Sequence, residues 1–241
     1  MTITAGRADL PRTTRDDAPT SWLLHSARPL GQALLHGWFD LSLRGVENVP
    51  AHGPVIIAGN HIGVLDGPLV AIVSPRPAHL LTKSELFGGV LGRLLSWTGQ
   101  IPVRRGEADP VSVRGALRVL RDGGVLGIFP EGNRGGGELV SCHPGVGYFA
   151  LATGAAVVPL SVLGTRLPGA ASGSLPPRGS RIVLSYGEPV RFGAQPWPRR
   201  VDEVREATSR IRNAMLATTR SAVDATGMSL PGPVPEGDTP P

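Results

Sequence analysis

The spacing of hydrophobic positions along the chain changes near Gly45. Before that residue, Trp22–Leu43 carries apolar side chains at roughly helical intervals around Pro29, which predicts a kinked helix. Beyond it, short apolar runs alternate with segments of helical periodicity. The runs predict buried strands over Pro54–Asn60, Ala78–Lys83, Gly124–Pro130, Ala156–Gly164 and Arg181–Gly187. The other segments predict helices over Gly67–Val73, Leu86–Thr98, Pro110–Arg121, Val146–Thr153 and Val201–Thr219.

Strands that alternate with helices predict an α/β fold, with a mostly parallel central sheet flanked by helices. We expect the α/β domain to span residues 44–220, after a helical lead-in over residues 21–43 that either packs on the core or contacts a membrane interface. Residues 1–20 are broken by proline and residues 221–241 are rich in proline and glycine, so both ends are predicted to be disordered tails. Ligands of such folds bind at the carboxyl ends of the strands, so the residues there are the first candidates for a site.

Composition narrows the class of protein. With 41% hydrophobic residues the 241-residue chain can bury a core, but no apolar stretch approaches the roughly 18 to 20 residues of a membrane-spanning helix. The start of the chain lacks a basic region followed by an apolar one, which predicts a cytoplasmic protein. A single cysteine, Cys142, excludes an intramolecular disulfide and a zinc site of several thiolates, and we expect no metal.

The charge of the chain favours an anionic partner. There are 24 basic against 19 acidic residues, and the isoelectric point is near 10.5. A phosphorylated metabolite, a coenzyme, nucleic acid or an anionic lipid surface would suit that balance. Nucleic acid is the poorest of these, because aromatic residues make up only 5% of the chain. Lys83 is the only lysine, which indicates either a site that needs a compact point charge or an ordinary solvated side chain.

A histidine and an aspartate follow the first predicted strand. On one continuous helix His61 and Asp66 would point about 140° apart, so they meet only across a loop, for which Gly63 and Gly67 give the backbone freedom. In a dyad, the Asp66 carboxylate would accept the Nδ1 proton and leave Nε2 of His61 as a general base. A chance pairing is the alternative, because the chain has six histidines and 19 acidic residues.

No motif for a protein nucleophile accompanies this pair. The sequence has no G-x-S-x-G elbow and no H-E-x-x-H zinc motif, and Cys142 lies beside His143 with no obvious partner. A base without a protein nucleophile would deprotonate a hydroxyl or a water supplied by the substrate. The segment Gly145–Ala150 satisfies G-x-G-x-x-A, but no strand precedes it and no acidic residue follows about twenty residues later, which excludes a dinucleotide site.

Other polar residues also follow predicted strands. Glu131, Gly132 and Arg134 come directly after a strand and would present backbone N–H groups and a guanidinium to a phosphate. A glycine-rich surface turn is the alternative. Arg104 and Arg105 are either further anion ligands or a solvated pair.

Taken together and in order, several segments resemble the motif blocks of the glycerolipid acyltransferases, the PlsC-like 1-acylglycerol-3-phosphate acyltransferase family. The blocks of that family are N-H-x4-D, G-x-I-x-V-x-R, F-P-E-G-[TSN]-R and a late V-P strand. This chain has NHIGVLD, then TKSEL and GQIPVRR, then FPEGNRG, then VVPLSV, over roughly residues 44–165. The resemblance implies the family's α/β fold and its HX4D chemistry.

The resemblance also implies a role for each matching residue. His61 would take the proton of the acceptor hydroxyl, and Asp66 would orient it. Substrate binding would fall to the cations and the loop of the second and third blocks, namely Lys83, Arg105, Glu131, Gly132, Asn133 and Arg134. Pro159 matches the late block, which shapes the acyl-donor side. Departures are Arg104, where an acidic or small polar residue is common, His143, where a lysine or arginine is common, and Asn133 in place of threonine.

The implied activity is an O-acyltransferase of phospholipid biosynthesis. It would move a fatty acyl chain from acyl-CoA or acyl carrier protein to lysophosphatidic acid or a related lyso-lipid, without a cofactor. The protein would be peripheral on the inner face of the cell membrane, with the anionic lipid surface as a partner. Two alternatives stay open: a different acceptor (an amino-lipid, a glycolipid or a polyketide hydroxyl), and a non-catalytic lipid-binding member of the fold.

Overall fold

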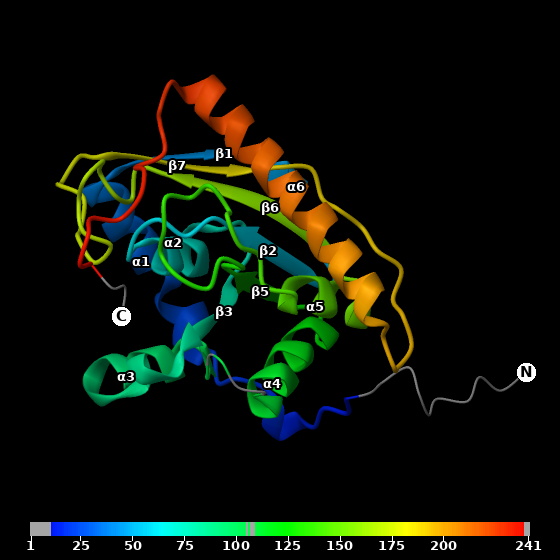
Figure 1. Cartoon of the computed structure of the whole chain (residues 1–241). Helices are drawn as coiled ribbons and strands as arrows, with labels where there is room; N and C mark the ends of the chain where they lie inside the picture. The colour runs from blue at the N-terminus through cyan, green and yellow to red at the C-terminus, as the bar shows by residue number, and fades with distance from the viewer. Residues whose placement is uncertain (1–10, 105, 107–108, 239–241) are drawn as a thin grey trace, which may run out of the picture.

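The computed structural model describes residues 11–104, 106 and 109–238 (Figure 1). Seven strands form one sheet in the order β1-β7-β6-β2-β5-β3-β4. The strands are β1 (Asp40–Arg44), β2 (Val55–Gly59), β3 (Ala78–Lys83), β4 (Ile101–Val103), β5 (Val125–Ile128), β6 (Ala156–Leu163) and β7 (Arg181–Tyr186). β6 and β7 pair antiparallel, and the other neighbouring strands pair parallel. The predicted α/β fold with a mostly parallel sheet is therefore confirmed.

Helices cover both faces of the sheet. They are α1 (Trp22–Trp38), α2 (Asp66–Val73), α3 (Gly89–Trp97), α4 (Pro110–Arg121), α5 (Gly145–Thr153) and α6 (Val201–Thr226), with short 3-10 turns η1 (Arg15–Asp17), η2 (Val46–Asn48) and η3 (Ser84–Phe87). α1 and α2 pack on one face, and α4, α5 and α6 pack on the other (Figure 1). β2 is buried throughout, because Val55 and Ile57 face the first layer of helices while Ile56 and Ala58 face the second. This explains its unbroken apolar run.

Two strands were not predicted. The helix expected over Trp22–Leu43 ends at Trp38, and Asp40–Arg44 forms β1 beside β7. Its sequence, DLSLR, alternates polar and apolar residues, which is the period of a half-buried strand rather than of a helix. β4 was missed because Ile101–Val103 is only three residues long and contains a proline.

The ends of the chain also differ from the predicted disordered tails. α6 continues to Thr226 and ends at Gly227, whose φ of 66° is left-handed, so the boundary predicted after residue 220 falls inside the helix. Near the start, the Asp17 carboxylate accepts a hydrogen bond from Arg114 Nε of α4 at 3.1 Å. Near the end, Asp238 accepts one from the Ser172 N–H. Residues 1–10 and 239–241 lie outside the described residues.

α1 has a packed side and an exposed apolar side. Leu24 is buried in the core, and Arg28 Nε donates to the Ile72 carbonyl at 2.8 Å. The large apolar residues that α1 exposes are Trp22, Leu30, Leu34 and Trp38. In the part of the chain that the structure describes, no helix has the length and hydropathy needed to cross a membrane.

Candidate active site

The loop between β2 and α2 brings the predicted histidine and aspartate together. His61 Nδ1 lies 2.8 Å from Asp66 Oδ2, although the two are five positions apart, because His61 lies in the loop and Asp66 is the first residue of α2. Gly63 is needed in this loop, since a Cβ there would lie 2.7 Å from the Thr165 carbonyl oxygen. The Asp66 side chain is fully buried, whereas that of His61 is 17% exposed. The pair therefore has a protected carboxylate and an accessible imidazole.

Several donors hold the Asp66 carboxylate in place. Oδ2 also accepts from the backbone N–H groups of Ile62 at 2.7 Å and Gly63 at 2.9 Å, and the Thr165 hydroxyl donates to Oδ1. A carboxylate with this many donors acts as an acceptor only, so Nδ1 of His61 donates and carries its proton. Nε2 on the opposite side of the ring is then the basic nitrogen. The first turn of α2 adds favourable dipole interaction with the negative charge.

Residues after β5 hold His61 from its other side. The Phe129 ring stacks on the imidazole, with centroids 4.4 Å apart and planes 16° apart. Glu131 Oε1 accepts a hydrogen bond from the backbone N–H of His61 at 2.9 Å. The Gly135 N–H in turn donates to the His61 carbonyl at 2.8 Å. The backbone on both sides of the catalytic candidate is thus tied to the β5–α5 loop.

The Glu131 carboxyl is perturbed by its surroundings. Its pKa is raised from 4.5 to about 7: burial is the main cause and the charge of Asp66 adds to it, whereas the hydrogen bond from the N–H of His61 opposes the shift. The Glu131 carboxyl group therefore changes between its protonated and ionised forms near neutral pH.

Glu131→Gln is expected to change the pH dependence of stability, because glutamine keeps an acceptor oxygen but has no proton to lose. The folded chain holds the Glu131 proton to about pH 7, whereas the unfolded chain releases it near 4.5. The free energy of unfolding therefore falls as pH rises through this window. Relative to wild type, the variant should gain up to about 3 kcal/mol across it.

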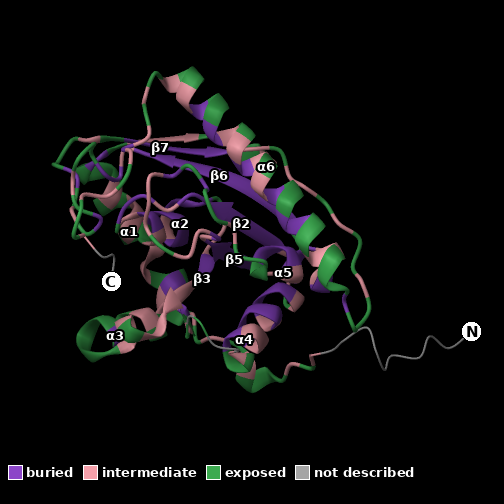
Figure 2. Cartoon of the chain, in the orientation of Figure 1, coloured by how far each residue is buried: buried purple, intermediate pink, exposed green. Residues whose placement is uncertain are grey.

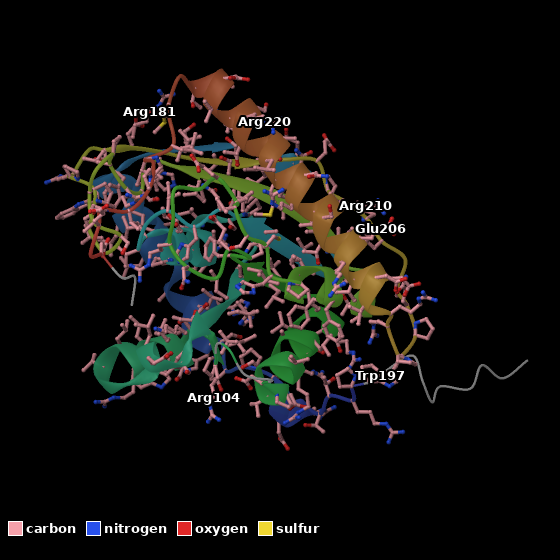
Figure 3. All side chains as sticks on the ribbon, viewed as in Figure 1. Arg104, Arg181, Trp197, Glu206, Arg210 and Arg220 are labelled. Carbon is pink, nitrogen blue, oxygen red and sulfur yellow. The ribbon has the colours of Figure 1, made fainter. Side chains whose placement is uncertain are left out.

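Thermal melts between about pH 4.5 and pH 8 measure this difference. The matched control is Glu206→Gln, on the exposed side of α6 (Figure 3), whose curve should run parallel to that of the wild type. If the Glu131→Gln curve were also parallel, the carboxyl would not be perturbed as described.

The other predicted site residues that the structure describes lie at the same end of the sheet but are not all in contact. Gly132 has a φ of 78°, and a Cβ there would lie 2.8 Å from His143 Nε2, so glycine is required beside that ring. Arg134 Nη1 donates to the Ser172 carbonyl at 3.0 Å. Asn133 is exposed in the same loop. Lys83 ends β3, two strands from β2, with Nζ 3.7 Å from Glu85 Oε1. Arg105 lies outside the described residues.

Sequence reasoning missed three residues that contact the site. Phe129 was read only as the end of a strand, but it stacks on His61. Thr165 and Arg166 follow β6, and they bond to Asp66 and to the Ile62 carbonyl respectively. The rule that sites lie after parallel strands could have indicated this pair.

A hollow of about 1090 Å³ lies next to the β5–α5 loop, between α4, α5 and α6. Apolar side chains such as Leu81, Val113 and Phe149 line it, and its arginines are Arg104, Arg199, Arg205 and Arg212. Figure 3 shows Arg104 and Trp197, both lining residues, on either side of α4. The loop that forms one wall is joined to the site, because the His143 N–H donates to the Pro130 carbonyl at 2.7 Å.

Comparison with protein families decides the classification. A family model described as Acyltransferase matches residues 40–163, which is half of the chain. The chain belongs to the acyltransferase family. The matched range contains His61, Asp66, Glu131 and Arg134 of this acyltransferase-family chain.

Three curated relatives are named 1-acyl-sn-glycerol-3-phosphate acyltransferases. The chain is 29% identical over 161 residues to the chloroplastic 1-acyl-sn-glycerol-3-phosphate acyltransferase of Arabidopsis thaliana. It is 34% identical over 102 residues and 36% over 127 residues to the 1-acyl-sn-glycerol-3-phosphate acyltransferases of Bacillus subtilis and Borreliella burgdorferi. The matches take in 64%, 39% and 50% of this chain, and they span 42%, 51% and 50% of the respective relatives, about half of each.

A solved structure has the same fold. The 1-acyl-sn-glycerophosphate acyltransferase PlsC of Thermotoga maritima superposes with a TM-score of 0.64 over 84% of this chain and 79% of that one. The two sequences are 22% identical. This likeness shows the acyltransferase fold.

Proposed function

We propose that this chain transfers a fatty acyl group from a thioester to the hydroxyl of lysophosphatidic acid or a related lyso-lipid, as a 1-acylglycerol-3-phosphate O-acyltransferase of phospholipid biosynthesis. The observation that carries the proposal is the His61–Asp66 pair, in which a buried carboxylate fixes the Nδ1 proton of an accessible imidazole. The names of the curated relatives support the substrate class.

The proposed reaction needs no cofactor and no covalent enzyme intermediate. Nε2 of His61 takes the proton of the acceptor hydroxyl as its oxygen attacks the thioester carbonyl carbon. The tetrahedral intermediate then collapses, the carbon–sulfur bond breaks, and the imidazolium returns the proton to the leaving thiolate. Asp66 stabilises the imidazolium while it carries that charge.

The acceptor phosphate is proposed to bind at the loop after β5. Gly132 permits the tight turn of this loop, and the loop carries the Arg134 guanidinium, which donates to the Ser172 carbonyl. Lys83, on the same end of the sheet, adds a compact positive charge. Arg105 and Asn133 belong to this proposed acceptor site through the family motifs.

The acyl donor is proposed to occupy the hollow between α4, α5 and α6. Its apolar walls match an acyl chain, and its arginines match the phosphates of acyl-CoA or the acidic surface of acyl carrier protein. A volume of about 1090 Å³ is slightly larger than that of ordinary ligand sites, which suits a long acyl thioester.

The test combines each donor with each acceptor. Purified protein is incubated with acyl-CoA or acyl carrier protein, and with lysophosphatidic acid, an amino-lipid, a glycolipid or a polyketide alcohol. We expect lysophosphatidic acid to give free thiol, which absorbance measures, and a diacylated phosphate lipid, which mass spectrometry identifies. Thiol release that does not depend on any acceptor, or vesicle binding without turnover, would refute the proposal.

A membrane surface is proposed as the partner that presents the acceptor, on the inner face of the cell membrane. α1 and α3 expose large apolar residues side by side, and the rings of Trp22 and Trp97 lie 6.4 Å apart. The exposed face of α3 is green at one edge of the molecule in Figure 2. Neither helix contains an acidic residue. Tryptophan with adjacent apolar and basic residues suits the interface of an anionic bilayer.

The double substitution Trp22→Ser and Leu94→Ser is expected to weaken vesicle binding at least tenfold, because each side chain loses about 1.5–3 kcal/mol of apolar burial. Co-sedimentation with phosphatidylglycerol vesicles measures it. Leu175→Ser, which removes an exposed leucine from the β6–β7 loop, is the matched control. Equal binding by the double variant and the control would contradict the proposed surface.

A further inference from the structure

Arg166 is the largest fully buried side chain of the described residues, with 2% of its surface exposed. Its guanidinium donates to four backbone carbonyls. Nε donates to Ile62 at 2.8 Å, Nη1 to Ala170 at 2.9 Å, and Nη2 to Gly135 at 3.0 Å and Gly232 at 2.6 Å. A buried guanidinium is costly unless its donors are satisfied, so an arginine at this position needs an explanation.

The four carbonyls belong to segments that are far apart in the sequence. Ile62 is the residue between His61 and the turn into α2, and Gly135 follows Arg134 in the β5–α5 loop. The Gly135 peptide bridges the two, because its N–H donates to the His61 carbonyl while its own carbonyl accepts from Arg166. One side chain therefore joins the loop of the catalytic pair, the proposed phosphate loop and the segment after α6.

Thr165 reaches the catalytic carboxylate itself. Its hydroxyl donates to Asp66 Oδ1, whereas the donors from His61, Ile62 and Gly63 all bind Oδ2. Its carbonyl oxygen also lies against Gly63, where no Cβ would fit. The Thr165 hydroxyl binds the second oxygen, and together with the donors on Oδ2 it fixes the rotation of the carboxylate about its Cβ–Cγ bond.

The end of β6 holds these two residues in register with the loop. The Asn60 side chain donates to the Val162 carbonyl at 3.0 Å and accepts from the Val162 N–H at 2.7 Å, which extends the β2–β6 pairing by one residue. The chain from Val162 to Arg166 therefore runs along the back of the loop that carries His61. The family match ends at residue 163, just before Thr165 and Arg166.

We propose that Thr165 and Arg166 are positioning residues for the acyl transfer: Thr165 fixes the Asp66 carboxylate, and Arg166 fixes the backbone between His61 and Asp66. The inference rests on the proposed function for its kinetic readout. Neither residue touches a reacting atom. Their loss should misplace the imidazole while leaving the substrate sites unchanged, which lowers kcat rather than raising KM.

The kinetic test compares near-isosteric variants. Thr165→Val, which removes only the hydroxyl, should lower kcat about 10- to 100-fold with KM within about twofold, and Thr165→Ser should restore kcat to within about threefold. Arg166→Lys should lower kcat about tenfold, because an ammonium cannot reach all four carbonyls. Thr153→Val, in α5, and Arg220→Lys, on α6 (Figure 3), are the matched controls and should keep wild-type kcat.

A second measurement does not depend on turnover. In the imidazole ¹H–¹⁵N spectrum, the Nδ1 proton shared with Asp66 should give a downfield resonance that Thr165→Val shifts or removes and Thr165→Ser retains. An unchanged resonance in Thr165→Val would overturn the inference even if no acceptor were ever acylated. Wild-type kcat in Thr165→Val, or equal losses in the valine and serine variants, would also overturn it. Failure of the wild type in the acceptor panel, with the spectrum as expected, would instead refute the proposed function alone.

Discussion

His61→Ala is expected to lower kcat for thiol release by about 10²- to 10⁴-fold, the range that general-base catalysis supplies. The change removes the Nε2 atom that takes the hydroxyl proton, but it leaves the proposed donor and acceptor sites in place, so both KM values should stay within about threefold. The His61 side chain is partly exposed and is not one of the buried core residues. Initial rates of thiol release over a range of both substrates give these constants.

The matched control for this variant is His52→Ala, which removes an exposed imidazole before β2 and should keep wild-type kinetics. Equal rates for wild type and His61→Ala would show that the imidazole is not the base. A different residue would then have to act as the general base.

Asp66→Asn is expected to lower kcat by a similar factor, about 10²- to 10⁴-fold, for a different reason. The amide oxygen can still accept from Ile62 and Gly63, and the amide nitrogen can donate to the Thr165 hydroxyl, so the loop keeps its shape. What disappears is the negative charge that stabilises the imidazolium during the reaction. Kinetics and thermal melting of the same preparation separate this loss of charge from a loss of folding.

Asp224→Asn, on the exposed side of α6, is the control for Asp66→Asn and should change neither rate nor melting temperature. A large drop in melting temperature for Asp66→Asn would mean that the carboxylate serves the fold. An unchanged kcat for Asp66→Asn would mean that the negative charge of Asp66 does not contribute to catalysis.

The strands most easily predicted from the sequence are those whose residues are buried along their whole length. β2 and β6 lie between two layers of helices, so all their positions except Ser161 of β6 are apolar and the run is plain in the sequence. β1 lies at the sheet edge with partly exposed residues, and its short alternating pattern merged with the helix before it. The sequence alone could not decide whether the side chains of His61 and Asp66 are in contact. That contact depends on the path of the loop between them, which the close approach of Gly63 to Thr165 constrains.

The remainder of the site depends on contacts that no local pattern encodes. Glu131 was predicted as part of a phosphate loop, but its carboxylate accepts from the backbone of His61. Arg134 bonds to the Ser172 carbonyl in the distant β6–β7 loop. Thr165 and Arg166 reach Asp66 and Ile62 only because β6 is paired with β2. Such pairings join residues about a hundred positions apart, and they become visible only when the sheet is assembled.

The place of β1 in the sheet has a consequence for synthesis of the chain. Asp40 pairs with Arg181, about 140 residues later, because β1 borders β7 and not β2. At about 5–20 residues per second, translation leaves this edge without its neighbour for several seconds or more. A ribosome-stalled nascent chain that ends before β7 would therefore hold β1 without its hydrogen-bonded neighbour, and contacts such as those of α1 with α2 would have to tie this edge to the rest of the body.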